Sequence, residues 1–245
     1  MSSKERLDRL MVERGMAPSR EKAQALIMAG QVVVGDHAAQ KAGQAVARDA
    51  AIRIKGDVLP FVSRGGLKLD AALTTFGVDP KGMVAIDVGA STGGFTDCLL
   101  QRGAQQVYAV DVGYGQLAWA LREDPRVVVM EKTNIRHLEP GSLDPAPSLA
   151  VIDASFISLE LVLPPTIGLL TRPASVVALI KPQFEVGREA VGKGGIVRDP
   201  IQHERAKHKI THCAEALGGR VVGICDSPIT GADGNREFLI RIDLE

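Results

Sequence analysis

Two lysines and two carboxylates lie at positions in the sequence where they could handle a proton together. Asp153 directly follows the apolar run in AVIDASF, and Lys181 directly follows the apolar run in ALIKPQF. Parallel strands would bring both residues to the carboxyl edge of a sheet, where open α/β sheets bind ligands. Lys68 precedes the first such run, and Glu237 begins the last one. A lysine among carboxylates can orient a hydroxyl group and assist the loss of its proton. Taken singly, each residue is more typical of a surface or capping position.

A glycine-rich segment could bind a nucleotide-like ligand. The run AIDVGASTGGF places Gly89 to Gly94 between a strand-like and a helix-like segment. Small residues let the backbone turn tightly and approach a ligand, and the following helix offers free N–H groups. Asp111 follows the next apolar run about twenty residues later, the offset at which dinucleotide-binding folds place the carboxylate that accepts ribose hydroxyls. A purely structural turn has a similar composition, and the glycine spacing is not the G-x-G-x-x-G of dinucleotide enzymes.

Alternating strands and helices must position these residues. Strand-like runs that do not alternate apolar and polar residues are typical of strands buried on both faces. The pattern predicts an α/β fold with a largely parallel, doubly wound sheet. Strands are expected at residues 84–88, 107–110, 127–130, 150–152, 176–180, 221–224 and 237–242, and helices at 96–101, 116–122, 157–170 and 203–217.

Residues 1–60 form a smaller α+β unit of their own, and residues 61–245 form the second domain. Leu7, Leu10 and Met11 predict a first helix that ends near Gly15, and Ser19 is the expected N-cap of a second helix that ends at Gly30. Strands are expected at residues 32–34 and 52–54, with a turn at Gly35-Asp36, and the breaker-rich residues 56–66 are expected to be the linker.

The overall composition excludes several classes of protein. The 245 residues are 45% hydrophobic and 24% charged, as in ordinary globular proteins. No apolar run reaches the roughly 18 residues of a membrane span, and the first residues lack the apolar core of a secretory signal. Three scattered cysteines do not suggest a disulfide framework or a zinc site, so we expect a cytoplasmic protein without a structural metal.

The net charge of zero conceals a difference along the chain, because residues 1–60, here called the front unit, are basic. Residues 1–60 contain ten Lys and Arg against seven Asp and Glu, which leaves 19 against 22 for the rest of the chain. Such an asymmetry suggests a polyanion contact at one end of the protein. The candidate contacts are Arg6, Arg9, Arg14, Arg20 and Lys22. An ordinary solvated helix face is the alternative explanation for these charges.

The front unit resembles a known RNA-binding module. The run RLDRLMVERGMAPSREKAQALIMAGQVVVGD is similar to an S4 domain, with Asp36 at a position where S4 sequences often carry Asn-Gly. The resemblance implies that the helix pair lays basic side chains along an RNA backbone.

The remaining motifs resemble those of Rossmann-like methyltransferases that use S-adenosylmethionine. Gly89 to Gly93, with Asp87 just ahead, is similar to their first motif, and Asn134 falls where they contact the adenine, although an ordinary turn residue is an equal alternative there. Lys68, Asp153, Lys181 and Glu237 together resemble the Lys-Asp-Lys-Glu tetrad of 2′-O-ribose methyltransferases. In that reaction a neutral Lys181 would deprotonate the ribose hydroxyl, whereas a protonated one would stabilise the developing alkoxide.

The order of motifs narrows the resemblance further. SRGGLKL, ASTGGFTD, DVGYGQLAW, DASFISL, IKPQFEVG, GKGGIVRD and GNREF occur in the order seen in the TlyA family, and with the S4-like unit the match covers nearly the whole chain. The resemblance implies a cytidine 2′-O-methyltransferase of ribosomal RNA that acts on RNA or a ribosomal subunit without an obligate protein partner. The chain ends soon after its last strand, as in the shorter members, which implies large-subunit RNA as substrate.

The resemblance also implies a set of binding residues. The cofactor would contact Asp87, Gly89, Ser91, Thr92, Gly93, Gly94, Phe95, Asp111, Asn134 and Asp153. Arg64 and Lys193 are candidate phosphate contacts, with solvated surface charges as the alternative. Phe156 and Tyr114 could stack on the adenine or on a flipped target base, and core packing is the alternative for Phe156.

Three other functions compete with this interpretation. Many TlyA proteins are labelled haemolysins, but a membrane-active protein would be expected to carry an amphipathic membrane-binding segment or alternating transmembrane strands. A catalytically inactive RNA-binding protein would have no need of an intact tetrad. Methylation of a base nitrogen usually uses an Asn/Asp-Pro-Pro-aromatic motif, whereas Asp153 is followed by Ala154-Ser155-Phe156.

Overall fold

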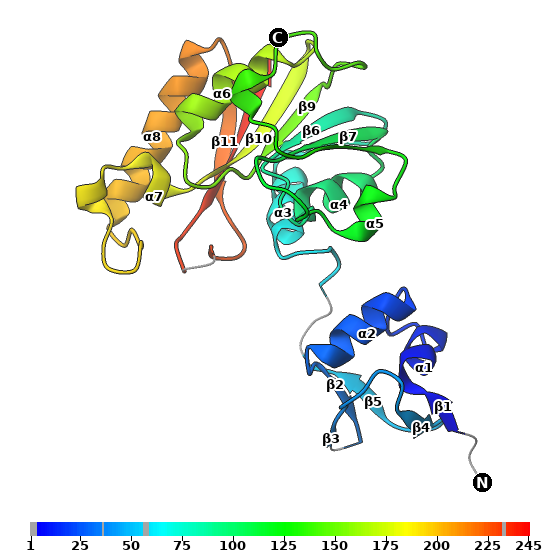
Figure 1. Cartoon of the computed structure of the whole chain (residues 1–245). Coiled ribbons are helices and arrows are strands. Elements are labelled where there is room, and N and C mark those ends of the chain that lie inside the picture. The colour runs from blue at the N-terminus through cyan, green and yellow to red at the C-terminus, as the bar shows by residue number, and fades with distance from the viewer. Residues whose placement is uncertain (1–3, 36, 56–58, 232–233) are drawn as a thin grey trace. The chain divides into compact units, whose positions relative to one another are not determined.

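The computed structural model describes residues 4–35, 37–55, 59–231 and 234–245. The chain divides into two compact units, Met1–Leu59 and Pro60–Glu245 (Figure 1). The predicted turn residue Asp36 and part of the predicted linker, residues 56–58, lie outside the described residues.

The front unit packs two short helices against small antiparallel sheets. Leu7, Leu10 and Met11 from the first helix and Leu26 and Ile27 from the second form its core with apolar residues of the strands. One sheet has the order β3-β2-β5, and β1 pairs with β4. The elements are β1 (Lys4–Arg6), α1 (Leu7–Glu13), α2 (Arg20–Met28), β2 (Val32–Val34), β3 (His37–Ala38), β4 (Ala45–Ala47) and β5 (Ile52–Ile54).

The helix boundaries in the front unit follow the sequence signals. The side chain of Ser19 accepts a hydrogen bond from the backbone N–H of Lys22, at 3.2 Å, so the expected N-cap of α2 is confirmed. Gly15 and Gly30 follow the ends of α1 and α2 with φ values of 69° and 68°, the left-handed conformation that glycine adopts without strain.

The larger unit is built on a seven-stranded sheet of order β11-β12-β10-β9-β6-β7-β8. The five strands from β10 to β8 are parallel, and β12 runs antiparallel to both of its neighbours. The predicted α/β class and largely parallel sheet are therefore confirmed. The strands are β6 (Val84–Val88), β7 (Gln106–Val110), β8 (Val127–Met130), β9 (Leu149–Ile152), β10 (Ala174–Ile180), β11 (Arg220–Asp226) and β12 (Phe238–Leu244).

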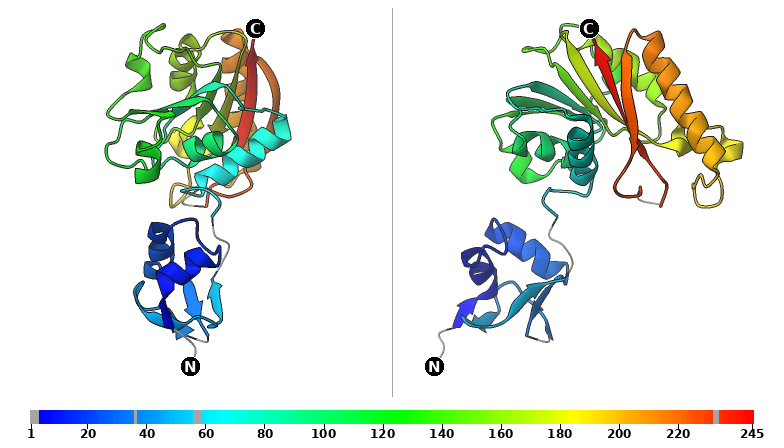
Figure 2. Two further views of the ribbon diagram at one scale, coloured as in Figure 1. Left: turned by 90° about the vertical axis from the view of Figure 1, so that its right-hand side faces the viewer. Right: turned by 180° about the vertical axis from the view of Figure 1, so that it is seen from behind.

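Helices cover both faces of this sheet (Figures 1 and 2). One core lies between the sheet and α6 and α8, and the other lies between the sheet and α3, α4 and α5. Buried side chains from opposite faces of the same strands, such as Ile86 and Ala85 of β6, enter the two cores. The helices are α3 (Gly65–Phe76), α4 (Gly94–Gln101), α5 (Trp119–Arg122), α6 (Leu159–Gly168), α7 (Pro182–Glu185) and α8 (Pro200–Ala216), with 3-10 turns at Ile135–His137 and Arg188–Ala190.

Some elements differ from the sequence expectations, which include no strand at β1, β3 or β4 and no helix at α3 or α7. Gly65 and Gly66 form the first turn of α3 rather than part of a linker. The packing explains the glycine, because a Cβ at Gly66 would lie 2.3 Å from the Phe61 ring. The helix expected at residues 116–122 begins only at Trp119, because Ala118 has an extended ψ of 138° and its N–H donates to the Thr92 carbonyl.

The strand order reverses beside β6. The chain passes from β6 to β7 and β8 on one side and then returns to β9 on the other side of β6. At such a reversal the loops that follow the two strands diverge and leave a crevice at the carboxyl edge. Gly89, after β6, and Asp153, after β9, meet there so closely that a Cβ on Gly89 would lie 2.7 Å from the Asp153 carbonyl oxygen.

Candidate active site

The four residues expected to act together line one cavity in the larger unit, with a volume of about 660 Å³. Lys68 lies in the first turns of α3, and Glu237 directly precedes β12. Asp153 and Lys181 follow β9 and β10 at the carboxyl edge of the sheet. The structure therefore brings these four residues together from four separate segments.

The four side chains form two ion pairs. The ammonium of Lys68 donates a hydrogen bond to Glu237 Oε2 at 2.6 Å, and both side chains are nearly buried. The ammonium of Lys181 lies 2.6 Å from Asp153 Oδ1. Each positive charge thus has a negative partner, which reduces the cost of holding two ammonium groups in one partly buried cavity.

Ser155 is a further residue that the sequence analysis did not single out. Its hydroxyl oxygen accepts a hydrogen bond from the Lys181 ammonium at 2.8 Å, and Ser155 lines the same cavity. Gln183 and Phe184 also line it. The sequence signal that could have identified these three residues is their position in the motifs DASF and KPQF, close to Asp153 and Lys181.

The glycine-rich loop forms one wall of this cavity. Gly89, Ser91, Thr92, Gly94 and Phe95 line it. Gly89 has a φ of 87°, so its conformation and its contact with Asp153 both require the absence of a side chain. A Cβ on Gly94 would lie 2.2 Å from Ser63 Oγ and 2.8 Å from the backbone nitrogen of Gly66, so that position also admits no side chain.

A second cavity, of about 500 Å³, adjoins the first. Gly89, Ser91, Asp153, Ser155 and Phe156 belong to both linings. The predicted residues Asp111 and Asn134 line the second cavity together with apolar residues, among them Val110, Ile135 and Val162.

Asp111 and Asn134 hold the loops around the second cavity. Asp111 accepts hydrogen bonds from the backbone N–H groups of Ser91 and Gly113, both at 2.7 Å. The side-chain oxygen of Asn134 accepts one from the N–H of Arg136, at 3.1 Å, which starts the 3-10 turn. A carboxylate, an amide and apolar walls side by side match the ribose and the ring of an adenosine.

Two of the residues expected to contact the cofactor, Asp87 and Gly93, line neither cavity. Asp87 lies fully buried beneath the loop, where its Oδ2 accepts a hydrogen bond from Thr96 Oγ1 at 2.6 Å. Burial raises the pKa of this carboxyl to about 7. A Cβ on Gly93 would lie 2.2 Å from Leu121 Cδ1, so this glycine permits close packing beneath the loop. Both residues therefore support the loop from the side away from the two cavities.

The predicted stacking residues are exposed. Phe156 lines both cavities, 91% of its surface is exposed, and its φ is 64°. A bulky residue rarely adopts this strained conformation, which is typical of functional sites. The ring of Phe184 lies 5.3 Å from that of Phe156. Tyr114 lines neither cavity and is covered by the ammonium of Lys132, 4.3 Å from its centroid.

The predicted phosphate contacts of the larger unit differ in position. Arg64 is exposed and lines the first cavity, the one that contains the two lysine–carboxylate ion pairs. Lys193 is exposed on a loop whose residues Val191 and Gly195 line that cavity, although Lys193 does not.

In the front unit, all the predicted basic residues except the half-buried Lys22 are exposed. Arg6 and Arg20 form ion pairs with Asp8, at 2.9 and 3.2 Å. The guanidinium of Arg14 instead donates to the backbone carbonyls of Ala50 and Arg48.

Comparisons with known proteins identify the domain families of both units. The S4 domain model matches residues 5–52, and the FtsJ-like methyltransferase model matches residues 61–244. A Bacillus subtilis protein with the provisional name rRNA methyltransferase YqxC is 53% identical, over 98% of this chain and 86% of its own length. The 16S/23S rRNA (cytidine-2′-O)-methyltransferase TlyA of Mycobacterium tuberculosis is 46% identical, over 98% of this chain and 90% of its own. A solved Streptococcus thermophilus protein with a provisional hemolysin label has a TM-score of 0.76 and 46% identity, covering 100% of this chain and 90% of its own.

Proposed function

The chain belongs to the TlyA family of FtsJ-like methyltransferases with an S4 domain, and we propose that it methylates a cytidine 2′-hydroxyl in ribosomal RNA of the large subunit. One observation carries the proposal. The ion pairs Lys68–Glu237 and Lys181–Asp153 line a single cavity that adjoins a second cavity suited to an adenosine. A site for the acceptor hydroxyl thus lies beside a site for the methyl donor.

The residues of the second cavity fit S-adenosylmethionine, the cofactor of this family. When bound, S-adenosylmethionine supplies a methyl group that its sulfonium has already activated. Asp111 would hold the ribose hydroxyls and Asn134 the adenine edge, while Ile135 and Val162 would cover the ring. Gly89 lets the backbone approach the ligand closely, because any larger residue would collide with Asp153.

The lysines and carboxylates align the acceptor hydroxyl and receive its charge. Lys181 has three N–H donors. One of them bonds to the Ser155 hydroxyl, and the ion pair with Asp153 holds the ammonium in the cavity. A further N–H of this ammonium would orient the ribose oxygen and stabilise the negative charge that develops on it as its proton leaves to solvent. Lys68, held by Glu237, adds a second fixed positive charge to the same cavity.

The front unit is an S4 domain, and RNA is the substrate class that this domain suggests. Its exposed arginines would contact phosphates, which position a protein on RNA without reading its sequence. Ribosomal RNA and ribosomal subunits are present in the cytoplasm, so the proposed reaction takes place there.

A methyl-transfer assay tests the proposal. The protein is incubated with tritiated S-adenosylmethionine and with large or small ribosomal subunits from a strain that lacks it, and the labelled RNA is digested to nucleosides. We expect the label in 2′-O-methylcytidine from large subunits. Label only in small subunits would contradict the assigned subunit, label on a base would contradict the acceptor, and no label would support an RNA-binding protein without catalytic activity.

The hemolysin label of the S. thermophilus structure names a second candidate function. No helix within the described part of the chain is long and apolar enough to cross a membrane. Release of haemoglobin from erythrocytes by the purified protein, measured beside methyl transfer for the parent and for Lys181→Ala, separates the two activities. Lysis that persists in the variant without methyl transfer would establish a separate membrane activity.

A further inference from the structure

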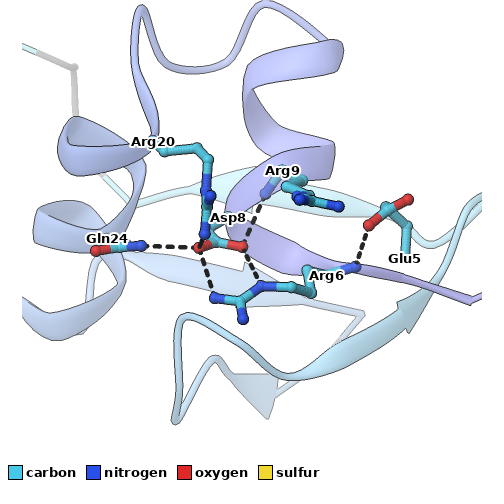
Figure 3. Close-up of polar contacts among 6 residues, drawn as sticks. All are labelled: Glu5, Arg6, Asp8, Arg9, Arg20 and Gln24. Carbon is cyan, nitrogen blue, oxygen red and sulfur yellow. Dashed lines mark hydrogen bonds and ion pairs between the residues drawn. The ribbon is translucent and has the colours of Figure 1, made fainter.

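Asp8 is a charged residue whose side chain is completely buried in the front unit. It lies in the first turn of α1, and its carboxylate is the point where two arginines from different elements meet (Figure 3). Arg6 Nε and Nη2 donate to its two oxygens at 3.0 and 2.9 Å, and Arg20 Nη2 donates to Oδ2 at 3.2 Å. Gln24 and the backbone N–H of Arg9 complete the shell, at 2.8 and 3.0 Å.

Both arginines keep donors for a further ligand. The side chains of Arg6 and Arg20 are 47% and 44% exposed, whereas that of Asp8 is 0% exposed. Within the described part of the chain, the Nη1 groups of both guanidiniums donate to no protein acceptor. Arg6 therefore uses one edge of its guanidinium on Asp8 and Arg20 a single Nη2 group, so both have other N–H groups free for the solvent side.

The shared carboxylate makes this arrangement possible. Two guanidiniums repel each other when brought together, and a negative charge between them removes most of that repulsion. The hydrogen bonds from Arg6, followed by those from Gln24 and Arg20, hold the pKa of Asp8 well below its usual range. Asp8 is thus ionised over the whole physiological range and orients both arginines before any ligand arrives. The Arg6 guanidinium is also confined by Gly43, where a Cβ would lie 3.3 Å from its Cζ.

We propose that Asp8 is a positioning residue that aligns Arg6 and Arg20 into one binding site for a phosphodiester group of RNA. A phosphate accepts several N–H donors at once, and planar guanidiniums with fixed directions match its geometry better than freely rotating ones. Less side-chain freedom is then lost on binding. The inference rests on the proposed function, because RNA supplies the phosphate.

The proposal and the overall charge predict opposite effects of Asp8→Asn on the affinity for RNA. Asp8→Asn removes a negative charge from the front unit, so charge alone predicts tighter binding of RNA. Loss of alignment predicts weaker binding instead. Glu21→Gln is the matched control, because Glu21 is exposed in the first turn of α2 and forms no ion pair within the described residues.

Filter binding of the full-length variants to 23S rRNA transcribed in vitro, at several salt concentrations, provides the test. We expect Asp8→Asn to weaken binding roughly five- to tenfold and to reduce the salt slope by about one phosphate contact, while Glu21→Gln leaves the affinity unchanged or raises it. In an Arg6→Ala/Arg20→Ala background, Asp8→Asn should cause almost no further loss. Affinity for Asp8→Asn equal to or above that of the parent would overturn the proposal, as would a full further loss in the double-alanine background.

A purely structural role must be distinguished, because Asp8 also connects α1 to α2 through Gln24. Thermal unfolding shows whether Asp8→Asn leaves the front unit folded, and Gln24→Ala removes that connection without touching an arginine. If Asp8→Asn does not fold, Arg20→Lys provides the second test, since it keeps the charge but loses the planar fork. We expect weaker binding with unchanged melting, and parental affinity would overturn the proposal. Methyl transfer by the parent, measured on large subunits, shows separately whether the proposed function holds.

Discussion

The carboxylate of Glu185 accepts a hydrogen bond from the backbone N–H of Leu159 at 2.8 Å and so joins the two loops that hold Asp153 and Lys181. Glu185 is the last residue of α7, the short helix that begins directly after Lys181. Leu159 is the first residue of α6, which begins shortly after Asp153. The same carboxylate accepts from Ser158 Oγ at 2.5 Å and pairs with Lys209 of α8 at 3.3 Å. A residue that lines neither cavity thus connects the segments that carry two of the proposed catalytic groups.

We expect Glu185→Ala to lower kcat by about 10- to 100-fold with little change in the affinity for the cofactor, because small displacements of catalytic groups cost rate rather than binding. Glu185→Gln should restore part of the rate, since an amide oxygen can still accept from Leu159. Glu160→Ala is the control, because Glu160 contacts Lys209 from an exposed position. Equal rates for all three variants would contradict a positioning role for Glu185.

The second prediction concerns Lys181 itself. Lys181→Ala removes the donor expected to stabilise the developing charge, so methyl transfer should fall by about 10²- to 10³-fold or more. Isothermal titration should show nearly unchanged binding of S-adenosylmethionine, because Asp111 and Asn134, which would hold the adenosine, line the second cavity, and Lys181 does not. Lys81→Ala, at an exposed position before β6, is the matched loss of an ammonium and should retain full activity. Substantial turnover by Lys181→Ala would refute the assigned role.

Gly89 provides a test of the cofactor loop. Gly89→Ala places a Cβ 2.7 Å from the Asp153 carbonyl at a φ of 87°, so the loop or the strand end must shift. We expect cofactor affinity to fall at least tenfold by titration calorimetry. Gly82→Ala is the control, because Gly82 has a φ of 73° but open space around it, so it carries the backbone strain without the collision. Similar affinities for the two variants would mean that the close approach is unimportant.

The fourth prediction follows from the buried Asp87. Its pKa is raised by burial to about 7 from an ordinary value of 3.8, so the folded state holds its proton more tightly than the unfolded state. The free energy of unfolding should therefore decrease as the pH rises from about 4 to 7. Asp87→Asn should remove this decrease, which amounts to at most on the order of 4 kcal/mol at 1.4 kcal/mol per pKa unit.

Urea unfolding, followed by the fluorescence of the single tryptophan, Trp119, in the larger unit, provides the measurement. The free energy of unfolding of Asp87→Asn, relative to that of the parent, should be higher at pH 7.5 than at pH 5. Asp79→Asn, at an exposed position, should retain the pH dependence of the parent. A constant difference between the Asp87 variant and the parent would show that Asp87 does not titrate in this range.

The sequence predicted the strands of the larger unit well because their signal is local. β-Branched apolar runs such as residues 84–88 need no knowledge of their neighbours, and the polar residue that follows a parallel strand must emerge at its carboxyl edge. The cap of α2 was equally local, since Ser19 bonds to a backbone group three residues away. For the same reason the positions of Asp153 and Lys181 at one sheet edge could be predicted before their contact was known.

What the sequence did not show depends on contacts between distant segments. Gly65 and Gly66 are typical of a linker, and only the proximity of Phe61 and α4 explains them as the start of a helix. Ser155 is an ordinary loop residue until Lys181 lies beside it. Asp8 gave no signal either, because its burial is produced by side chains that converge from β1 and α2.

The reversed direction of β12 has a consequence for how the enzyme is completed during synthesis. Because β12 opposes β10, with Phe238 beside Ile180, Glu237 emerges at the edge where the parallel strands end. A parallel strand of seven residues would have carried it about 23 Å away, to the opposite rim. β12 is also an inner strand, with β11 on its outer side (Figure 2). A nascent chain that has not yet released residues 237–244 from the ribosome thus lacks an inner strand as well as the partner of Lys68, so we expect the sheet and the proposed catalytic site to be completed together.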